Sequence, residues 1–225
     1  MLHVLNFTGH RDKKLADLMR AGVEKFGYRF SQTFTEIWCD DTEWGNGAGW
    51  EASMMKVRIL RNFSHIADSS YLLSVDSDVL FFTPDLFNYV EETKPEICGL
   101  MNEITVETLI GPMRHLSGCL TFIRGDVMKR INSITDEELL EVRKQFKQID
   151  LCENEDVVVS YLAKKVGAEF RNLPHEYRNG SIEEDLISGN LKSMYHVNYM
   201  PTQFLGEPVT GKWDIPDVLK LKWFV

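Results

Sequence analysis

Residues 71–82 read YLLSVDSDVLFF, an apolar β-like run that delivers two carboxylates, Asp76 and Asp78, at the end of a predicted strand. In an extended segment, side chains two residues apart point the same way, so both carboxylates can face one divalent cation. The apolar neighbours predict burial, where two charges would be costly without a cation or hydrogen-bond donors. An Asx-type turn that caps the strand end explains the same pair, so the spacing alone leaves both interpretations open.

Strand-like and helix-like segments alternate on both sides of this run. The predicted strands are residues 2–8, 30–38, 71–75, 97–101, 119–123, 170–173 and 194–197, and the last two are expected to close the sheet. The predicted helices are residues 12–26, 50–63, 84–92, 125–131, 136–146 and 155–166. The third of them is expected to have Thr83 as its N-cap and Pro84 at its first helical position. Such alternation implies an α/β fold with a mainly parallel, Rossmann-like central sheet flanked by helices, in which ligands sit at the carboxyl ends of the strands. Asp76 and Asp78 stand at such an end.

The length and composition favour one domain spanning residues 1–225, because 225 residues with 44% hydrophobic content can bury one sizeable core. The net charge of −9 and the absence of a Lys/Arg block exclude the basic footprint of a duplex-binding protein. Every apolar stretch is broken by charge before it reaches the length that a bilayer requires, so we expect no membrane anchor. A strand begins almost at Met1, so we expect no signal peptide either.

The four cysteines, Cys39, Cys98, Cys119 and Cys152, are scattered and form no Cys-x-x-Cys pair. This pattern fits reduced thiols in a cytoplasmic protein better than a disulfide framework or a zinc site. We therefore expect all four to be small core residues.

Three motifs in order along the chain resemble the sugar-nucleotide-binding core of GT-A glycosyltransferases, particularly the glycogenin and bacterial lipopolysaccharide galactosyltransferase family. They are residues 55–60 (MKVRIL), 71–78 (YLLSVDSD) and 83–86 (TPDL). Residues 117–123 (SGCLTFI) look like the family's Asn-Ser-Gly strand, with His115-Leu116 where an Asn often stands. Residues 153–157 (ENEDV) resemble its acidic helix start, which usually reads Asp-Gln. The resemblance implies a single GT-A-like domain.

The resemblance further implies transfer of a sugar, as in hexosyltransferases, from a nucleotide-diphosphate sugar, with a UDP-sugar as the expected donor. Residues 195–197 (YHV) resemble the family's late strand with a metal-ligating histidine, so the implied metal ligands are Asp76, Asp78 and His196. Two carboxylates and one imidazole suit Mn²⁺, or Mg²⁺ as the alternative cofactor. A histidine at a strand end can equally be a structural residue.

The residues expected to bind the donor come from several segments. Lys56 could pair with the diphosphate or the sugar, although a solvated helix charge explains it equally well. Residues 8–11, after the first strand, stand where such folds receive the nucleotide base, or form a polar loop. Lys212, a displaced and altered match to the family's Gly-x-x-Lys-Pro-Trp, is the candidate phosphate ligand. The expected donor-binding residues are Thr8, His10, Lys56, Asp76, Ser117, Gly118 and Lys212.

Glu155 and Asp156 are the candidate catalytic carboxylates, with Asp156 as the first choice. Such a group could deprotonate an acceptor in an inverting enzyme or hold the donor sugar in a retaining one. The resemblance favours retention. An ordinary acidic first turn, stabilised by the helix dipole, explains the same residues.

The acceptor is not readable, because acceptor pockets are built from variable loops, here expected at residues 102–115 and 204–213. A glycan, a protein, a small molecule and a modified nucleobase all remain open. A nucleotidyltransferase would also place paired carboxylates on a metal, but the chain lacks a glycine-rich phosphate loop. A non-catalytic nucleotide-sugar-binding module is the other alternative.

Overall fold

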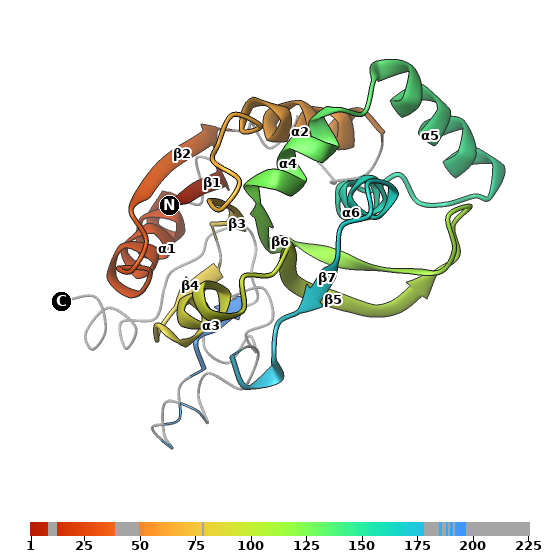
Figure 1. Cartoon of the computed structure of the whole chain (residues 1–225). Coiled ribbons are helices and arrows are strands. Elements are labelled where there is room, and N and C mark those ends of the chain that lie inside the picture. The colour runs from red at the N-terminus through yellow and green to blue at the C-terminus, as the bar shows by residue number, and fades with distance from the viewer. Residues whose placement is uncertain are drawn as a thin grey trace. The chain divides into compact units, whose positions relative to one another are not determined.

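The computed structural model of the chain describes residues 1–8, 13–38, 50–77, 79–177, 185, 188, 190 and 192–196. In chain order the elements are β1 (Leu2–Thr8), α1 (Lys13–Phe26), β2 (Gln32–Trp38), α2 (Trp50–Asn62), β3 (Tyr71–Asp76), β4 (Val79–Phe81), α3 (Asp85–Thr93), β5 (Ile97–Val106), β6 (Met113–Arg124), α4 (Gly125–Asn132), α5 (Asp136–Gln148), α6 (Glu155–Lys165), β7 (Phe170–Asn172), the 3₁₀ turn η2 (His175–Tyr177) and β8 (Met194–His196). Figure 1 shows this alternation of strands and helices along the chain. The architecture is mixed α/β with a mostly parallel central sheet flanked by helices, which confirms the predicted fold class.

The described residues divide between two compact units. The first contains Met1–His3, Asp40–Ser74 and Pro95–Asn172, and the second contains Val4–Cys39, Val75–Lys94 and Leu173–Val225. Each unit is therefore assembled from segments far apart in the sequence. The expectation of a single domain over residues 1–225 stays a prediction.

In the first unit, strands β3, β6, β5 and β7 are hydrogen-bonded neighbours in that order. Helices α4 and α6 contact β6, and α2 contacts both of these helices. Part of the core lies between α2, α5 and α6, where the ring of Phe146 packs edge to face against Trp50 and Tyr161, with centroids 6.4 and 5.0 Å apart. This apolar packing fixes α2 and α6, the two helices that carry the candidate site residues of this unit.

Strands β5 and β6 are longer than the sequence predicts and form an antiparallel hairpin, with Ile97 opposite Ile123 and Val106 opposite Met113. The acceptor loop expected at residues 102–115 is therefore wrong as a loop, since residues 102–106 belong to β5 and residues 113–115 to β6. The chain reverses at residues 107–112, where Gly111 takes a φ of +94° that glycine alone adopts readily. The connection between the two strands is therefore limited to residues 107–112.

In the second unit, β1 and β2 are neighbours, and β4 pairs with β8 in a separate two-stranded ladder. The expectation that residues 194–197 close the central sheet is wrong, because β8 pairs with β4 instead. Aromatic rings pack along this ladder, with Phe82 and Tyr195 meeting edge to face at 5.4 Å. Helix α1 contacts β4. β4 is therefore a separate strand from β3, and a turn at Ser77 lies between them.

A distant serine caps helix α3. We expect Thr83 as the N-cap with Pro84 at the first helical position, but Pro84 is the N-cap and makes no side-chain capping bond. Ser193 replaces it: its hydroxyl accepts a hydrogen bond from the Leu86 N–H at 3.0 Å and donates to the Thr83 carbonyl at 2.9 Å. The start of α3 is therefore fastened to the strand that carries His196.

The cysteine prediction is right for two residues and wrong for one. Cys98 and Cys119 are buried, and burial raises the pKa of the Cys98 thiol to about 12, which keeps it protonated and inert. Cys152 is exposed, because it lies in the loop before α6 and not in an element that faces the core. Cys39 lies outside the described residues.

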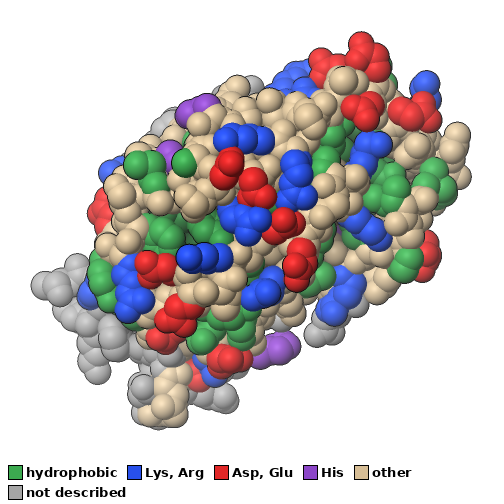
Figure 2. Space-filling view, viewed as in Figure 1, with side chains coloured by type: hydrophobic (Ala, Val, Ile, Leu, Met, Phe, Trp, Pro, Cys, Tyr) green, Lys and Arg blue, Asp and Glu red, His purple; other side chains and the backbone are tan. Residues whose placement is uncertain are grey.

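The described helices include none with the length and apolar character of a membrane span. On the face shown in Figure 2, the Lys and Arg side chains of the described residues are intermixed with Asp and Glu and form no patch of one sign. The cytoplasmic location expected from the sequence stays a prediction.

Candidate active site

A small pocket in the first unit brings together four of the predicted site residues. It is lined by residues of α2, β3, β6 and α6, and α6 contacts both α2 and β6. Figure 1 labels α2, α6 and β6. Aliphatic side chains such as Leu60 and Val159 form part of its wall. The polar and glycine positions on the wall are Lys56, Ser74, Ser117, Gly118, Thr121, Asp156 and Ser160. A concave site with a few convergent polar groups among apolar ones is typical of small-molecule recognition.

Lys56 and Glu155 form a largely buried ion pair at one side of the pocket. The Lys56 Nζ donates to the Glu155 Oε1 at 2.7 Å, and the two side chains are 6% and 20% exposed. The alternative of a solvated helix charge is therefore wrong for Lys56. Removing one partner of a buried pair leaves an uncompensated charge in the protein, so each residue depends on the other.

Gly118 allows this ion pair to approach β6. A Cβ atom at position 118 would lie 2.8 Å from the Glu155 Oε1 and 3.7 Å from the Lys56 Nζ. The first distance is shorter than any ordinary carbon–oxygen contact, so a side chain here would displace the carboxylate. The sequence motif around Ser117 and Gly118 thus has a steric role beside the donor-binding role that we predict.

The turn that precedes α6 is held by two other helices. The Ser53 hydroxyl of α2 donates to the Glu153 carbonyl at 2.6 Å, and the Arg143 Nε of α5 lies 3.5 Å from the Glu153 Oε1. Asn154 follows as the N-cap, so Glu155 and Asp156 occupy the first turn of α6, where the helix dipole favours negative charge. The Asp156 Oδ1 also accepts a hydrogen bond from the Val157 N–H at 2.8 Å. The two candidate carboxylates are therefore fixed by the fold and do not lie on a free loop.

His115 also belongs to this cluster, although the sequence gives it no role beyond its place in the expected acceptor segment 102–115 and beside the motif at residues 117–123. Its Nε2 lies 3.5 Å from the Asp156 Oδ2 and 3.2 Å from the Asn102 Nδ2, and the residue is only 8% exposed. One signal was available in the sequence: His115 stands two residues before Ser117, and such positions share one face of a strand. The contact with Asp156, on a helix 41 residues later by their numbers, needs the tertiary structure.

The predicted metal ligands all belong to the second unit. Asp76 ends β3, whereas Asp78 and the side chain of His196 lie outside what the structure describes. The ladder of β4 and β8 places His196 directly opposite Val79, the residue after Asp78. Opposite Cα atoms in an antiparallel ladder are about 4.5–5.5 Å apart, so the backbone of His196 is close to that of Val79. In the described part of the chain, no group of three His, Cys, Asp or Glu residues could hold a metal ion.

Asn6 is a second residue that the sequence does not single out for function. It is buried in β1, and its Nδ2 donates to the Val75 carbonyl at 2.9 Å and lies 3.4 Å from the Ser77 hydroxyl. It therefore holds the chain on both sides of Asp76, where β3 ends. A single buried amide in a strand is a weak signal, because such residues are usually structural.

The remaining predicted donor-binding residues are less well defined by the structure. Thr8 ends β1, and its side chain is not among those described. His10 and Lys212 lie outside the described residues. Their roles stay predictions.

The amino-acid sequence matches no protein-family model and no curated protein. The structure is similar to that of the galactosyltransferase LgtC in complex with donor and acceptor sugar analogues, with a TM-score of 0.52, 10% identity and 86% of each chain covered. The chain has the fold of the GT-A glycosyltransferases. An active-site mutant of LgtC gives a TM-score of 0.53 at 12% identity, again over 86% of each chain. The predicted GT-A fold is thereby confirmed.

A third solved structure is a glycosyltransferase involved in the glycosylation of the major capsid of PBCV-1. It matches at 12% identity with a TM-score of 0.49, over 87% of this chain and 93% of that one. At identities of 10% and 12%, the two LgtC likenesses establish the fold alone, and the chemistry has to be argued from the residues of this chain.

Proposed function

We propose that this GT-A chain is a glycosyltransferase that moves a hexose from a nucleotide-diphosphate sugar, in the first place a UDP-sugar, to an acceptor. The observation that carries the proposal is the pocket of the first unit. Lys56, Gly118 and Asp156 are distant in the sequence, and the fold brings all three to one pocket wall. A cation, a carboxylate and several hydroxyl groups around a small cavity suit the recognition of a sugar ring and its leaving group.

In the reaction, the bond between the anomeric carbon and the diphosphate oxygen breaks, and the acceptor oxygen forms a bond to that carbon and loses its proton. Asp156 accepts hydrogen bonds from the donor sugar, because one of its oxygens is already fixed by the Val157 N–H while its side chain lines the pocket. Glu155 stands beside it, with one oxygen on Lys56 and the other buried with no hydrogen-bond partner among the described residues. We assign retention of the anomeric configuration, with these two carboxylates holding the donor sugar.

Mn²⁺, or Mg²⁺ in its place, would be held by Asp76, Asp78 and His196. The register of β4 and β8 supports this ligand set, because it puts the backbone of His196 opposite the residue that follows Asp78. Two carboxylates and an imidazole suit Mn²⁺, which accepts oxygen and nitrogen donors. When bound, the cation would neutralise the negative charge on the leaving nucleotide diphosphate.

A donor screen tests the proposal. UDP-glucose, UDP-galactose and related nucleotide sugars are added with and without Mn²⁺, and binding is followed by calorimetry and by thermal shift. We expect one donor to stabilise the protein only when Mn²⁺ is present, by about 2.7 kcal/mol when its concentration is 100 times the Kd. A panel of glycans, proteins, small molecules and modified nucleobases then identifies the acceptor, and NMR of the product shows whether the anomeric configuration is retained.

Two outcomes contradict the proposal. Incorporation of the nucleotide into a product, without transfer of the sugar, assigns the chain to the nucleotidyltransferases. Tight, Mn²⁺-dependent binding with no product or hydrolysis across the whole panel assigns it to the non-catalytic binding modules.

A further inference from the structure

His115 is a buried titratable residue that the roles above leave unused. It lies on β6, and its residue exposure is 8%. Its Nε2 faces the Asp156 Oδ2 at 3.5 Å and the Asn102 Nδ2 at 3.2 Å, and its Nδ1 has no hydrogen-bond partner among the described residues. The ring therefore meets the candidate carboxylate with one nitrogen only.

The two neutral tautomers of His115 differ in what they leave unpaired. With the proton on Nδ1, a buried N–H has no acceptor and the bare Nε2 lone pair faces a carboxylate oxygen. With the proton on Nε2, the donor is the nitrogen that lies 3.5 Å from the Asp156 Oδ2, and the unpaired atom is a lone-pair acceptor. Orphaned buried donors are rarer in proteins than orphaned acceptors. The second tautomer also accommodates Asn102, because the oxygen and nitrogen of an amide are interchangeable by a flip of the side chain.

We infer that His115 carries its ring proton on Nε2 and thereby positions the carboxylate of Asp156 for the donor sugar, an inference that rests on the proposed function. The Asp156 Oδ1 accepts a hydrogen bond from the Val157 N–H at 2.8 Å, and the His115 Nε2 lies 3.5 Å from the Oδ2. A carboxylate fixed at both oxygens presents its remaining lone pairs to the pocket in one orientation. The present separation of 3.5 Å is longer than a hydrogen bond, and such contacts commonly shorten when substrate binds.

The tautomer can be measured without any activity assay. In the full chain labelled with ¹⁵N at histidine, long-range proton–nitrogen NMR spectra report which ring nitrogen carries the proton. We expect the His115 Nε2 to be protonated, and its signal to shift in the Asp156→Asn variant. A proton on Nδ1 in the unaltered protein overturns the inference. So does an Nε2 signal that has the same chemical shift in the unaltered protein and in the Asp156→Asn variant.

Kinetics separate positioning from simple structural support. His115→Ala should lower turnover by about 10- to 100-fold, the usual effect of losing an outer partner of a functional group, while the KM for the donor changes little. His115→Gln should recover part of the turnover, because its amide can still donate to Asp156. In an Asp156→Asn background, His115→Ala should cost nothing further, since its effect runs through that carboxylate. The exposed His65→Gln is the matched control and should leave turnover unchanged.

Additive losses in the double variant, or equal losses with His115→Gln and His115→Ala, overturn the positioning role. Thermal melting of each variant shows whether it is folded, and the glutamine variant keeps the test valid if the alanine variant is not. If the unaltered chain transfers no sugar from any donor, the proposed function fails, and the NMR tautomer still decides whether His115 holds Asp156.

Discussion

The two units of the chain carry candidate residues of opposite kinds. In the second unit, Asp76 and Asp78 are two residues apart, and one strand ladder adds the backbone of His196. In the first unit, the Lys56–Glu155 pair joins residues 99 positions apart, and Gly118 on a third element lets the pair approach β6. The first kind of site is visible as a spacing in the sequence, and the second kind exists only after folding.

The two units also differ in what compensates their charges. The carboxylate of Glu155 is compensated by a lysine of the same chain, so this part of the site is tied to the stability of the fold. The proposed carboxylates of the second unit would be compensated by a cation, so they should matter for ligand binding and little for folding. Substitutions of the Lys56–Glu155 pair in the first unit should therefore lower the stability of the fold, whereas substitutions of the carboxylates in the second unit should lower ligand binding.

The largest effect is expected for Asp78→Asn in the second unit. A neutral amide cannot supply the charge that a divalent cation requires, so Mn²⁺-dependent binding of UDP should fall at least about 100-fold while the melting temperature stays nearly unchanged. Isothermal calorimetry and thermal melting measure the two quantities. Asp68→Asn, an exposed carboxylate 2.5 Å from Lys129, is the control and should bind normally. Full activity of the Asp78→Asn variant would show that Asp78 does not bind the metal. The contrast between the two units would then also be wrong.

The next effect is expected for Asp156→Asn in the first unit. Turnover should fall by about 100-fold or more, because a group that assists the reacting centre is lost, while the Kd for the nucleotide changes by less than about threefold. Steady-state kinetics and calorimetry on the same preparation check this. Asp150→Asn, an exposed residue in the turn before α6, should change neither. Equal losses in turnover and affinity would point to simple placement of the donor.

A smaller effect, on stability, is expected for Lys56→Met. The variant leaves the Glu155 carboxylate buried without its partner, which should reduce the free energy of unfolding by about 2 kcal/mol, somewhat below the usual range because Glu155 is 20% exposed. Urea unfolding measures the loss. Adding Glu155→Gln should recover part of it, because the buried charge is then removed as well.

Lys129→Met is the matched control for Lys56→Met. Lys129 pairs with Asp68, and both side chains are well exposed, so the expected loss is below about 1 kcal/mol. Equal losses in the two lysine variants would mean that the Lys56–Glu155 pair behaves as a surface pair, and the distinction drawn between the units would fail.

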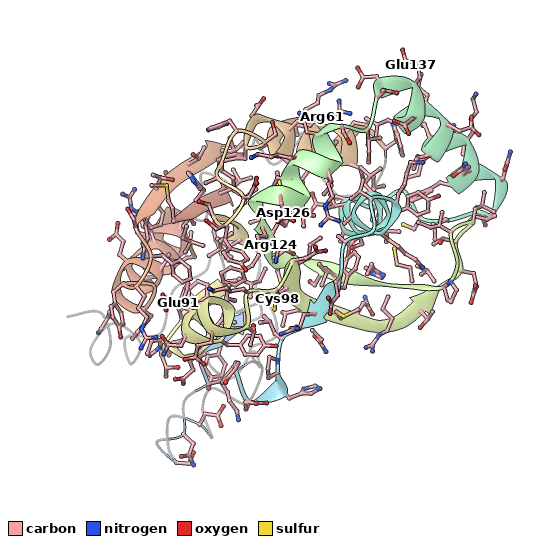
Figure 3. All side chains as sticks on the ribbon, viewed as in Figure 1. Arg61, Glu91, Cys98, Arg124, Asp126 and Glu137 are labelled. Atoms are coloured by element: carbon pink, nitrogen blue, oxygen red, sulfur yellow. The ribbon has the colours of Figure 1, made fainter. Side chains whose placement is uncertain are left out.

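Apart from the control variants, the smallest effect is expected for Asp126→Asn, which tests charge pairing in the first unit away from the pocket. Figure 3 labels Arg124 and Asp126, whose side chains pair at 2.5 and 3.0 Å where β6 passes into α4. The hydrogen bond from Arg124 lowers the pKa of Asp126 from its ordinary value of 3.8. The pair therefore stabilises the fold above that value and loses its contribution as the pH falls through the lower folded pKa.

Asp126→Asn should lower the free energy of unfolding by about 1 kcal/mol at neutral pH. The difference from the unaltered protein should shrink below about pH 3.8, where Asp126 begins to be protonated in the unfolded chain. Chemical unfolding at neutral pH and at about pH 3 compares the two. A constant difference across this range would contradict the pairing as its cause.

The sequence predicts most elements to within one or two residues, because apolar periodicity and local breakers act over short distances. It errs where partners are remote. The hydroxyl of Ser193 accepts a hydrogen bond from the N–H of Leu86 in α3, which is 107 residues away in the sequence. No local sequence pattern predicts this contact. The pairing of residues 194–197 with β4 and the length of the β5–β6 hairpin were missed for the same reason, since strand partners are chosen by the whole fold.

The candidate site divides along the same line. The sequence alone determined the α/β alternation, the GT-A order of motifs and the identity of Lys56, Ser117, Gly118, Glu155 and Asp156 as residues of interest. Only the tertiary structure decided that Lys56 is buried against Glu155, that Gly118 makes room for both, and that His115 meets Asp156. The physical reason is that spacing along a strand or helix fixes which side chains share a face, whereas burial and charge pairing depend on which faces the folded chain brings into contact.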